Sequence, residues 1–156
     1  MAVATPARSS RSRAPEAAHA FRSADELHEV FARLFETLNR DDRVGPLLQA
    51  ARLRMRIVCP DVRGVIQVWP GEDSGAYLEW RFDRRGGVKP QLELTMDSDV
   101  LNEWMQGRES VPMAIAHRRM KCSGEARVAL LYLPAVKLIA GPYRRLIKSA
   151  YAHLVL

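Results

Sequence analysis

The stretch from Leu92 to Gly124 constrains the fold most, because strand-like and helix-like patterns alternate there over short distances. Leucine and methionine alternate with polar residues from Leu92 to Met96, which predicts a strand with one covered face. Residues 97–99 (Asp-Ser-Asp) then end the strand and offer side-chain oxygens to cap a helix. Apolar residues follow at helical spacing until Gly107, which predicts a short amphipathic helix that ends at this glycine.

A second short helix and a strand complete this stretch. Ser110 and Pro112 are typical of a helix start, since proline in the first turn loses no hydrogen bond. The following residues are apolar up to His117. Residues 118–123 return to a strand pattern, and Gly124 ends it. The two carboxylates of Asp97 and Asp99 are interpreted as helix caps and not as an acid–base pair.

The flanking segments complete an α+β domain. A strongly periodic apolar stripe predicts a helix from Ala24 to about Arg40, and a shorter helix follows within 41–52. Alternating patterns then predict strands at 53–58, 65–69 and 77–82, joined by tight turns. With the strands at 92 and 118, these give a five-stranded, largely antiparallel sheet covered on one face by helices. The segment from Ala126 onward is apolar and helical, with predicted breaks at Pro134 and at Gly141-Pro142.

The order of these motifs resembles the sterol carrier protein 2 lipid-binding domain. The residues that carry the resemblance are LELTMDSD (92–99), WMQG (104–107), VPMA (111–114) and RMKCSG (119–124). The resemblance extends from about Ala24 to the C-terminus. It implies a sterol-carrier-like fold with an apolar tunnel between sheet and helices, covered in part by the last helix. The implied ligand is a sterol, a fatty acyl chain or another lipid.

Apolar residues after Thr95 outnumber those needed to cover one face of a sheet. This surplus is interpreted as the lining of a ligand tunnel or, alternatively, as a homodimer interface. By their place in the motif, the ligand-binding residues are predicted to form a wall and a lid. The wall residues are Trp104, Met105, Met113 and Met120, and the lid residues are Leu133, Ile139, Tyr143 and Ile147.

Composition limits the number of domains and the class of protein that this chain can form. A chain of 156 residues with 47% hydrophobic content is predicted to form one domain at residues 23–156, preceded by a disordered basic tail at 1–22. The sequence contains no run of 18 apolar residues, so no membrane span is predicted. Cys59 and Cys122 lack metal-ligand spacing, which favours free thiols in a cytoplasmic protein.

Motifs for catalysis and for cofactors are not found in the sequence. The four histidines are scattered, and none is spaced for metal binding. No glycine-rich phosphate loop and no Gly-x-Ser-x-Gly nucleophile motif occurs. The sequence therefore predicts a non-catalytic protein without cofactor or metal.

Two other functions remain open at this level. One is an enzyme or a pathway accessory protein that acts on a steroid- or polyketide-like intermediate in the same pocket, with His117, Tyr132 or Tyr143 as proton donor. The other is a module that uses the basic tail to contact nucleic acid or, transiently, a membrane surface. The sequence favours the lipid carrier, with no specific nucleic-acid partner.

Overall fold

The structure, a computed structural model, describes residues 19–156 except for the side chains of Ala126, Ala129, Leu131, Tyr132 and Leu133. Most of the predicted tail thus lies outside the described residues. Its last part, residues 19–22, belongs to the folded body. Phe21 is buried in the core, and its N–H donates to Oγ of Ser98 at 3.1 Å.

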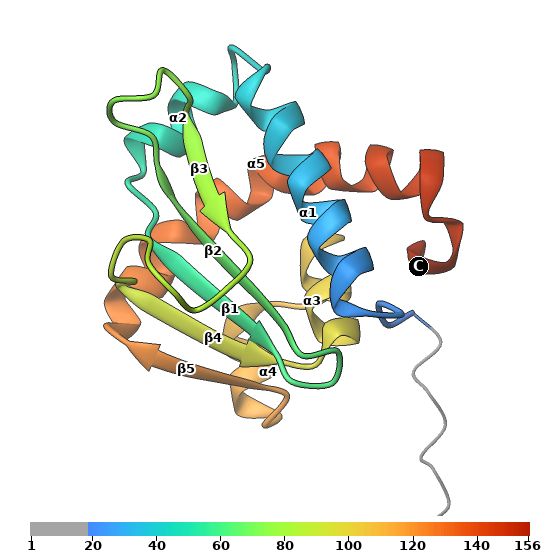
Figure 1. The fold of residues 1–156 in the computed structure, drawn as a ribbon. Coiled ribbons are helices and arrows are strands. Elements are labelled where there is room, and N and C mark those ends of the chain that lie inside the picture. The colour runs from blue at the N-terminus through green and yellow to red at the C-terminus, as the bar shows by residue number, and fades with distance from the viewer. Residues whose placement is uncertain (1–18) are drawn as a thin grey trace, which may run out of the picture.

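Helices and strands follow one another in the order predicted for an α+β domain (Figure 1). The helices are α1 (Ala24–Asn39), α2 (Gly45–Ala50), α3 (Ser98–Met105), α4 (Val111–Ala116), α5 (Ala126–Ala150) and the short 3-10 helix η1 (Ala152–Leu154). The strands are β1 (Met55–Cys59), β2 (Gly64–Pro70), β3 (Leu78–Arg81), β4 (Leu92–Met96) and β5 (Met120–Gly124).

The strands form one five-stranded sheet in the order β3-β2-β1-β4-β5. Neighbouring strands are antiparallel except β1 and β4, which are parallel. The parallel pair arises because β1, β2 and β3 form a meander, after which the loop of residues 82–91 carries the chain back across the sheet. The predicted five-stranded, largely antiparallel sheet is confirmed.

The two faces of the sheet differ in chemistry. On the inner face, which the helices cover, Ile57 of β1 lies opposite Ile66 of β2 and Leu94 of β4. On the outer face, Arg56 lies opposite Gln67 and Glu93 in the same strands. This alternation follows from the two-residue period of a strand. In Figure 1 the helices gather on one side of the sheet, and the 82–91 loop crosses the other.

Local capping and tertiary hydrogen bonds place the helices. Ser23 caps α1, and its hydroxyl accepts from the N–H of Glu26 at 3.1 Å. At the other end of α1, Asn39 exchanges two hydrogen bonds with the backbone of Leu78 in β3, at 2.8 and 2.9 Å. These two bonds anchor the end of α1 to the edge of the sheet.

The start of α3 is capped by a residue that the sequence did not indicate. Asp97 occupies the N-cap position, but its side chain makes no capping hydrogen bond. Asp61, in the turn between β1 and β2, instead accepts from the N–H and the hydroxyl of Ser98 at 3.0 and 2.7 Å. Burial, and then the charges of Asp61 and Asp99, raise the pKa of Asp97. Asp61 therefore caps α3 in place of Asp97, for which the sequence predicted this role.

The last helix corrects a prediction. Breaks were expected at Pro134 and at Gly141-Pro142, yet α5 continues through both prolines for 25 residues. Each proline removes one backbone hydrogen bond from the helix. Packing against α1, α3 and the sheet offsets this loss, since Val136, Ile139 and Tyr143 belong to the core. Among the described helices, none is long and apolar enough to cross a membrane.

Candidate functional site

Most of the predicted ligand-binding residues lie together between the sheet and the helices. The buried residues of this group are Trp104 and Met105 of α3, Met120 of β5, and Ile139, Tyr143 and Ile147 of α5. They are brought together because the apolar stripe of each element faces the same interior. Met113 is not among them, because its side chain is 50% exposed on α4. The side chain of Leu133 lies outside the described residues.

Exposure of the inward-facing residues changes along α5. In the first part of the helix, Val128, Val136 and Ile139 keep 8–9% of their surface exposed, and Ala135 keeps 6%. In the last part, Tyr143 and Ile147 are 0% exposed. Leu94, on the inner face of β4, is also nearly fully covered, with an exposure of 1%. The inward-facing residues in the first part of α5 are thus slightly less covered than Tyr143 and Ile147, although all of them are buried.

A buried polar network lies beside this apolar interior. The hydroxyl of Tyr143 and the amide of Gln106 both donate to Oδ1 of Asn102 at 2.8 Å. The Asn102 amide donates in turn to the backbone carbonyls of Leu154 and His19, at 2.8 and 3.0 Å. This network joins α3 and α5 to both ends of the described chain.

Sequence reasoning missed Asn102 and Gln106 as key residues. Their spacing carried a usable signal, since Ser98, Asn102 and Gln106 recur every four residues on one side of the predicted helix. Such a polar row next to an apolar stripe indicates buried side chains that need hydrogen-bond partners. The partners themselves lie at positions 19 and 154, far away in the sequence.

The structure also places the residues considered as proton donors. Burial raises the pKa of Tyr143, so its hydroxyl stays neutral, and it is already engaged with Asn102. His117 follows α4 and is exposed. The side chain of Tyr132 lies outside the described residues. Tyr143 thus lies in the interior and His117 lies on the surface, so the two residues do not form a common site.

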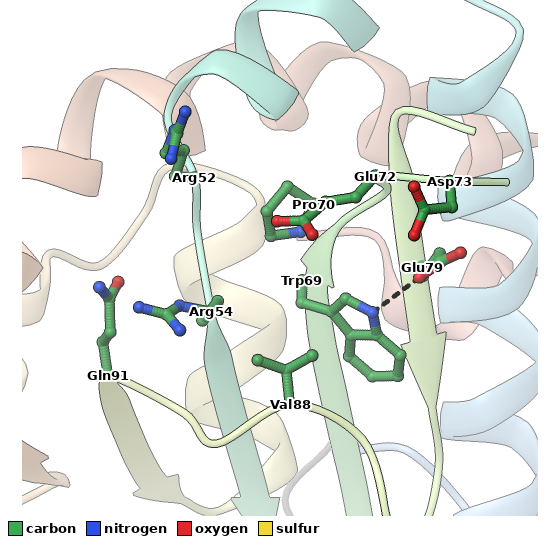
Figure 2. A pocket seen from close by; sticks show the side chains of 9 residues that line it. All are labelled: Arg52, Arg54, Trp69, Pro70, Glu72, Asp73, Glu79, Val88 and Gln91. Carbon is green, nitrogen blue, oxygen red and sulfur yellow. Dashed lines mark hydrogen bonds between the residues drawn. The ribbon is translucent and has the colours of Figure 1, made fainter. Parts of the chain in front are cut away.

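A second candidate site is a hollow on the outer face of the sheet (Figure 2). Its volume is about 620 Å³. Its walls come from the start of β1, the end of β2, β3 and the 82–91 loop. The lining residues are Arg52, Arg54, Trp69, Pro70, Glu72, Asp73, Glu79, Val88 and Gln91. Sequence reasoning assigned no function to any of them.

In the part of the chain that the structure describes, no three His, Cys, Asp or Glu side chains are arranged to hold a metal ion. A smaller hollow of about 390 Å³, between the ends of β4 and β5, contains Asp97 and Asp99 together with Arg118 and Lys121. Carboxylates and cations thus both line this hollow.

Solved structures share this fold at low sequence identity. The apo form of sterol carrier protein 2 from Yarrowia lipolytica aligns with a TM-score of 0.53 and 9% identity, over 75% of this chain and 91% of that one. A structure described as UbiJ-SCP2 ubiquinone synthesis protein aligns with a TM-score of 0.53 and 11% identity, over 72% and 88% of the two chains. The chain has the sterol-carrier-protein-2-like fold.

The same fold also matches part of a larger enzyme. The sec-alkylsulfatase Pisa1 from Pseudomonas sp. aligns with a TM-score of 0.50 and 16% identity, over 67% of this chain. The aligned part is only 15% of that enzyme. No protein-family model and no curated protein matches the sequence.

Proposed function

We propose that this chain binds a hydrophobic small molecule, such as a sterol, a fatty acyl chain or another lipid, between the inner face of the sheet and α5. The observation that supports the proposal is that, in a sterol-carrier-protein-2-like fold, Val128, Val136 and Ile139 of α5 belong to one buried apolar cluster with the inner face of the sheet. These side chains face an interior lined by flexible Met105 and Met120. Methionine adapts its shape to varied apolar partners at low cost.

The expected affinity is modest. Burying roughly 400 Å² of ligand surface at about 25 cal/mol/Å² contributes about 10 kcal/mol. Association and ordering cost about 4 kcal/mol or more, which leaves an affinity in the micromolar range or weaker. Such an affinity suits a carrier, because the ligand must also be released.

The positions of two polar residues favour binding over catalysis. The hydroxyl of Tyr143 donates to Asn102 within the buried network and is occupied. His117 is exposed at the end of α4 and does not line the interior. Neither residue is arranged to protonate a ligand beneath α5. The alternative of an enzyme on a hydrophobic intermediate predicts loss of turnover in His117→Ala or Tyr143→Phe.

The test is a titration with a fatty acid that carries a nitrobenzoxadiazole fluorophore, followed by displacement with unlabelled oleate. We expect saturable binding in the micromolar range. Native mass spectrometry of the purified protein would report a retained ligand and the number of subunits in one measurement. Absence of saturable binding contradicts the proposal, and a dimer that buries the face of α5 contradicts it equally.

A space-filling variant sharpens this test. Ala135 is buried in the first part of α5, so Ala135→Phe would occupy the space proposed for the ligand. We expect at least about a tenfold loss of affinity with nearly unchanged thermal stability. Leu130→Phe is the matched control, because Leu130 is exposed on the same helix. If the interior is already full, Ala135→Phe instead lowers stability by about 1–3 kcal/mol, as overpacking does.

A further inference from the structure

The outer-face hollow contains an aromatic side chain held in a fixed orientation. The indole N–H of Trp69 donates to the carboxylate of Glu79, which lies opposite it in β3, at 2.8 Å. On another side, the backbone of the 82–91 loop lies against the ring, since a Cβ added at Gly87 would lie 3.4 Å from Cζ3 of Trp69. Gly87 adopts a φ of +77°, which favours glycine.

The remaining surface of the Trp69 ring faces the hollow. Among the described residues, no aromatic ring stacks on Trp69 and no cation lies over it. Val88 and Pro70 supply the apolar surface beside it (Figure 2). A rigid indole with adjacent aliphatic groups is a suitable platform for a flat ring.

The opposite wall of the hollow contains an arginine that has no ionic partner among the described residues. Arg54 and Arg56 lie on the same face of the sheet at the start of the chain's first strand. Arg56 pairs with Glu93 at 2.9 Å and donates to Gln67 at 3.3 Å. Within residues 19–156, the half-buried Arg54 makes no ion pair and no side-chain hydrogen bond.

The backbone holds Arg54 in this position. Its carbonyl accepts from the N–H of Gln91 at 2.9 Å, which joins the start of β1 to the end of the 82–91 loop. Figure 2 shows Arg54 and Gln91 on one wall of the hollow, Trp69 on the other, and Val88 between them. A planar guanidinium without a partner is well suited to bind a carboxylate with two parallel hydrogen bonds.

The rim limits the charge of a ligand. Glu72 and Asp73 are exposed at the end of the hollow beyond Pro70. Their negative charges oppose a ligand with several anionic groups, such as a nucleotide, whereas a single carboxylate near Arg54 avoids them. The volume of about 620 Å³ falls within the ~300–1,000 Å³ range of small-molecule sites.

We propose that the outer-face hollow binds a planar aromatic monocarboxylate. Its carboxylate pairs with Arg54, and its ring packs over Val88 against Trp69. This site lies on the face of the sheet opposite the apolar interior, so it is independent of the lipid site proposed above. It assigns a role to the unpaired guanidinium and to the immobilised indole.

The test uses the three tryptophans as separate reporters. Trp69 lines the hollow, Trp80 packs against Phe35 with ring centroids 5.3 Å apart, and Trp104 is buried in α3. In protein labelled with ¹⁵N-tryptophan, each indole N–H gives its own NMR signal. We expect 2-naphthoate to shift the Trp69 signal saturably at submillimolar concentration while the other two signals move little.

Two further compounds test the charge requirement. 2-Naphthamide has the same ring without the negative charge, and we expect it to bind at least about tenfold more weakly. Adenosine monophosphate has a ring and a dianionic phosphate, and repulsion from the rim carboxylates should weaken its binding by a similar factor. Equal binding of the carboxylate and the amide overturns the proposal. A shift of Trp104 in place of Trp69 also overturns it, because the ligand then occupies the interior.

Variants assign the contacts by isothermal titration calorimetry. We expect Arg54→Gln to weaken 2-naphthoate binding by about tenfold or more, since it removes a hydrogen-bonded charge pair. Trp69→Leu should weaken it by a similar factor. Arg85→Gln is the matched control, because it removes one positive charge from the 82–91 loop and Arg85 does not line the hollow. This substitution should change the affinity less than about twofold. Unchanged binding in Arg54→Gln overturns the proposal, even if Trp69→Leu fails to fold.

Discussion

The two faces of the sheet are held together by different forces, although the same strands form both. On the inner face, Leu94 belongs to the buried apolar core and is almost fully covered. One residue later, Thr95 points to the outer face and is only half-buried. There, charged and amide side chains pair across strands, as Arg56 does with Glu93 and Gln67.

This difference indicates what each face can bind. The inner face offers shape and apolar contact, and a buried polar network around Asn102 lies beside it. The outer face offers directional groups at fixed positions, and in Arg54 one of them remains without an ionic partner in the described structure. A lipid fits the first environment and a charged aromatic acid fits the second.

The largest difference in stability is expected between substitutions at Leu94 and Thr95, two neighbouring residues of β4 whose side chains lie on opposite faces of the sheet. Leu94→Ala leaves a cavity in the core and should lower the free energy of unfolding by about 2–5 kcal/mol. Thr95→Ala, on the outer face of the same strand, should lower it by about 0.5 kcal/mol or less. Urea unfolding of both variants measures the difference, and similar losses would mean that the inner face is not the better packed one.

The next effect concerns the polar network of the inner side. Asn102→Ala leaves the Tyr143 hydroxyl and the His19 carbonyl without a partner and should lower the free energy of unfolding by about 3 kcal/mol. Tyr143→Phe removes one donor and should cost only about 1 kcal/mol, because Gln106 still donates to Asn102. Thermal unfolding would show the contrast. Equal losses in the two variants would contradict the role of Asn102 as the centre of the network.

A smaller effect is expected from the ion pair on the outer face. Arg56 and Glu93 have side chains that are 19% and 28% exposed. A double-mutant cycle with Arg56→Gln and Glu93→Gln should give a coupling free energy of about 0.5–1 kcal/mol. The coupling should decrease at 1 M NaCl, because salt screens exposed pairs. A larger and salt-independent value would show that this face is drier than its exposure indicates.

The smallest effect concerns His28 of α1. Its ring stacks on Phe82 with centroids 4.6 Å apart. Burial lowers the pKa of His28 below its ordinary value of 6.5, although Asp25 and a hydrogen bond with the Val65 backbone oppose this shift. The unfolded chain therefore binds the proton more readily, and stability should fall as the pH drops below about 6.5.

Substitution of this histidine isolates its contribution. In His28→Gln we expect a weaker loss of stability between about pH 7 and pH 5 than in the unchanged protein. Denaturant midpoints measured across this range give the comparison. If the two proteins lose stability in parallel as the pH falls, His28 does not contribute to this loss, and the carboxylates cause it.

Much of the fold follows from local patterns. The apolar stripe of α1, the alternation of β4 and the proline-containing start of α4 each predicted their element within a few residues. α5 is the exception, because Pro134 and Pro142 disfavour a helix locally and only burial of their neighbours offsets that cost.

The candidate sites were less accessible from sequence. The interior residues Trp104, Met120 and Ile139 were predictable as a group, because each belongs to an apolar stripe that must be covered. Asn102 was missed because its partners are far away along the chain. The hollow beside Arg54 and Trp69 was missed because four separate segments build it.

By itself, the sequence determined which residues of each strand and helix turn inward, since periodicity is a local property of the backbone. It also determined the order of the elements and, with them, the class of fold. Only the tertiary structure decided that β4 lies parallel to β1, which brings Gln91 to Arg54 and leaves the 82–91 loop against Trp69. Strand order depends on the summed packing of the whole chain, and no single segment encodes it.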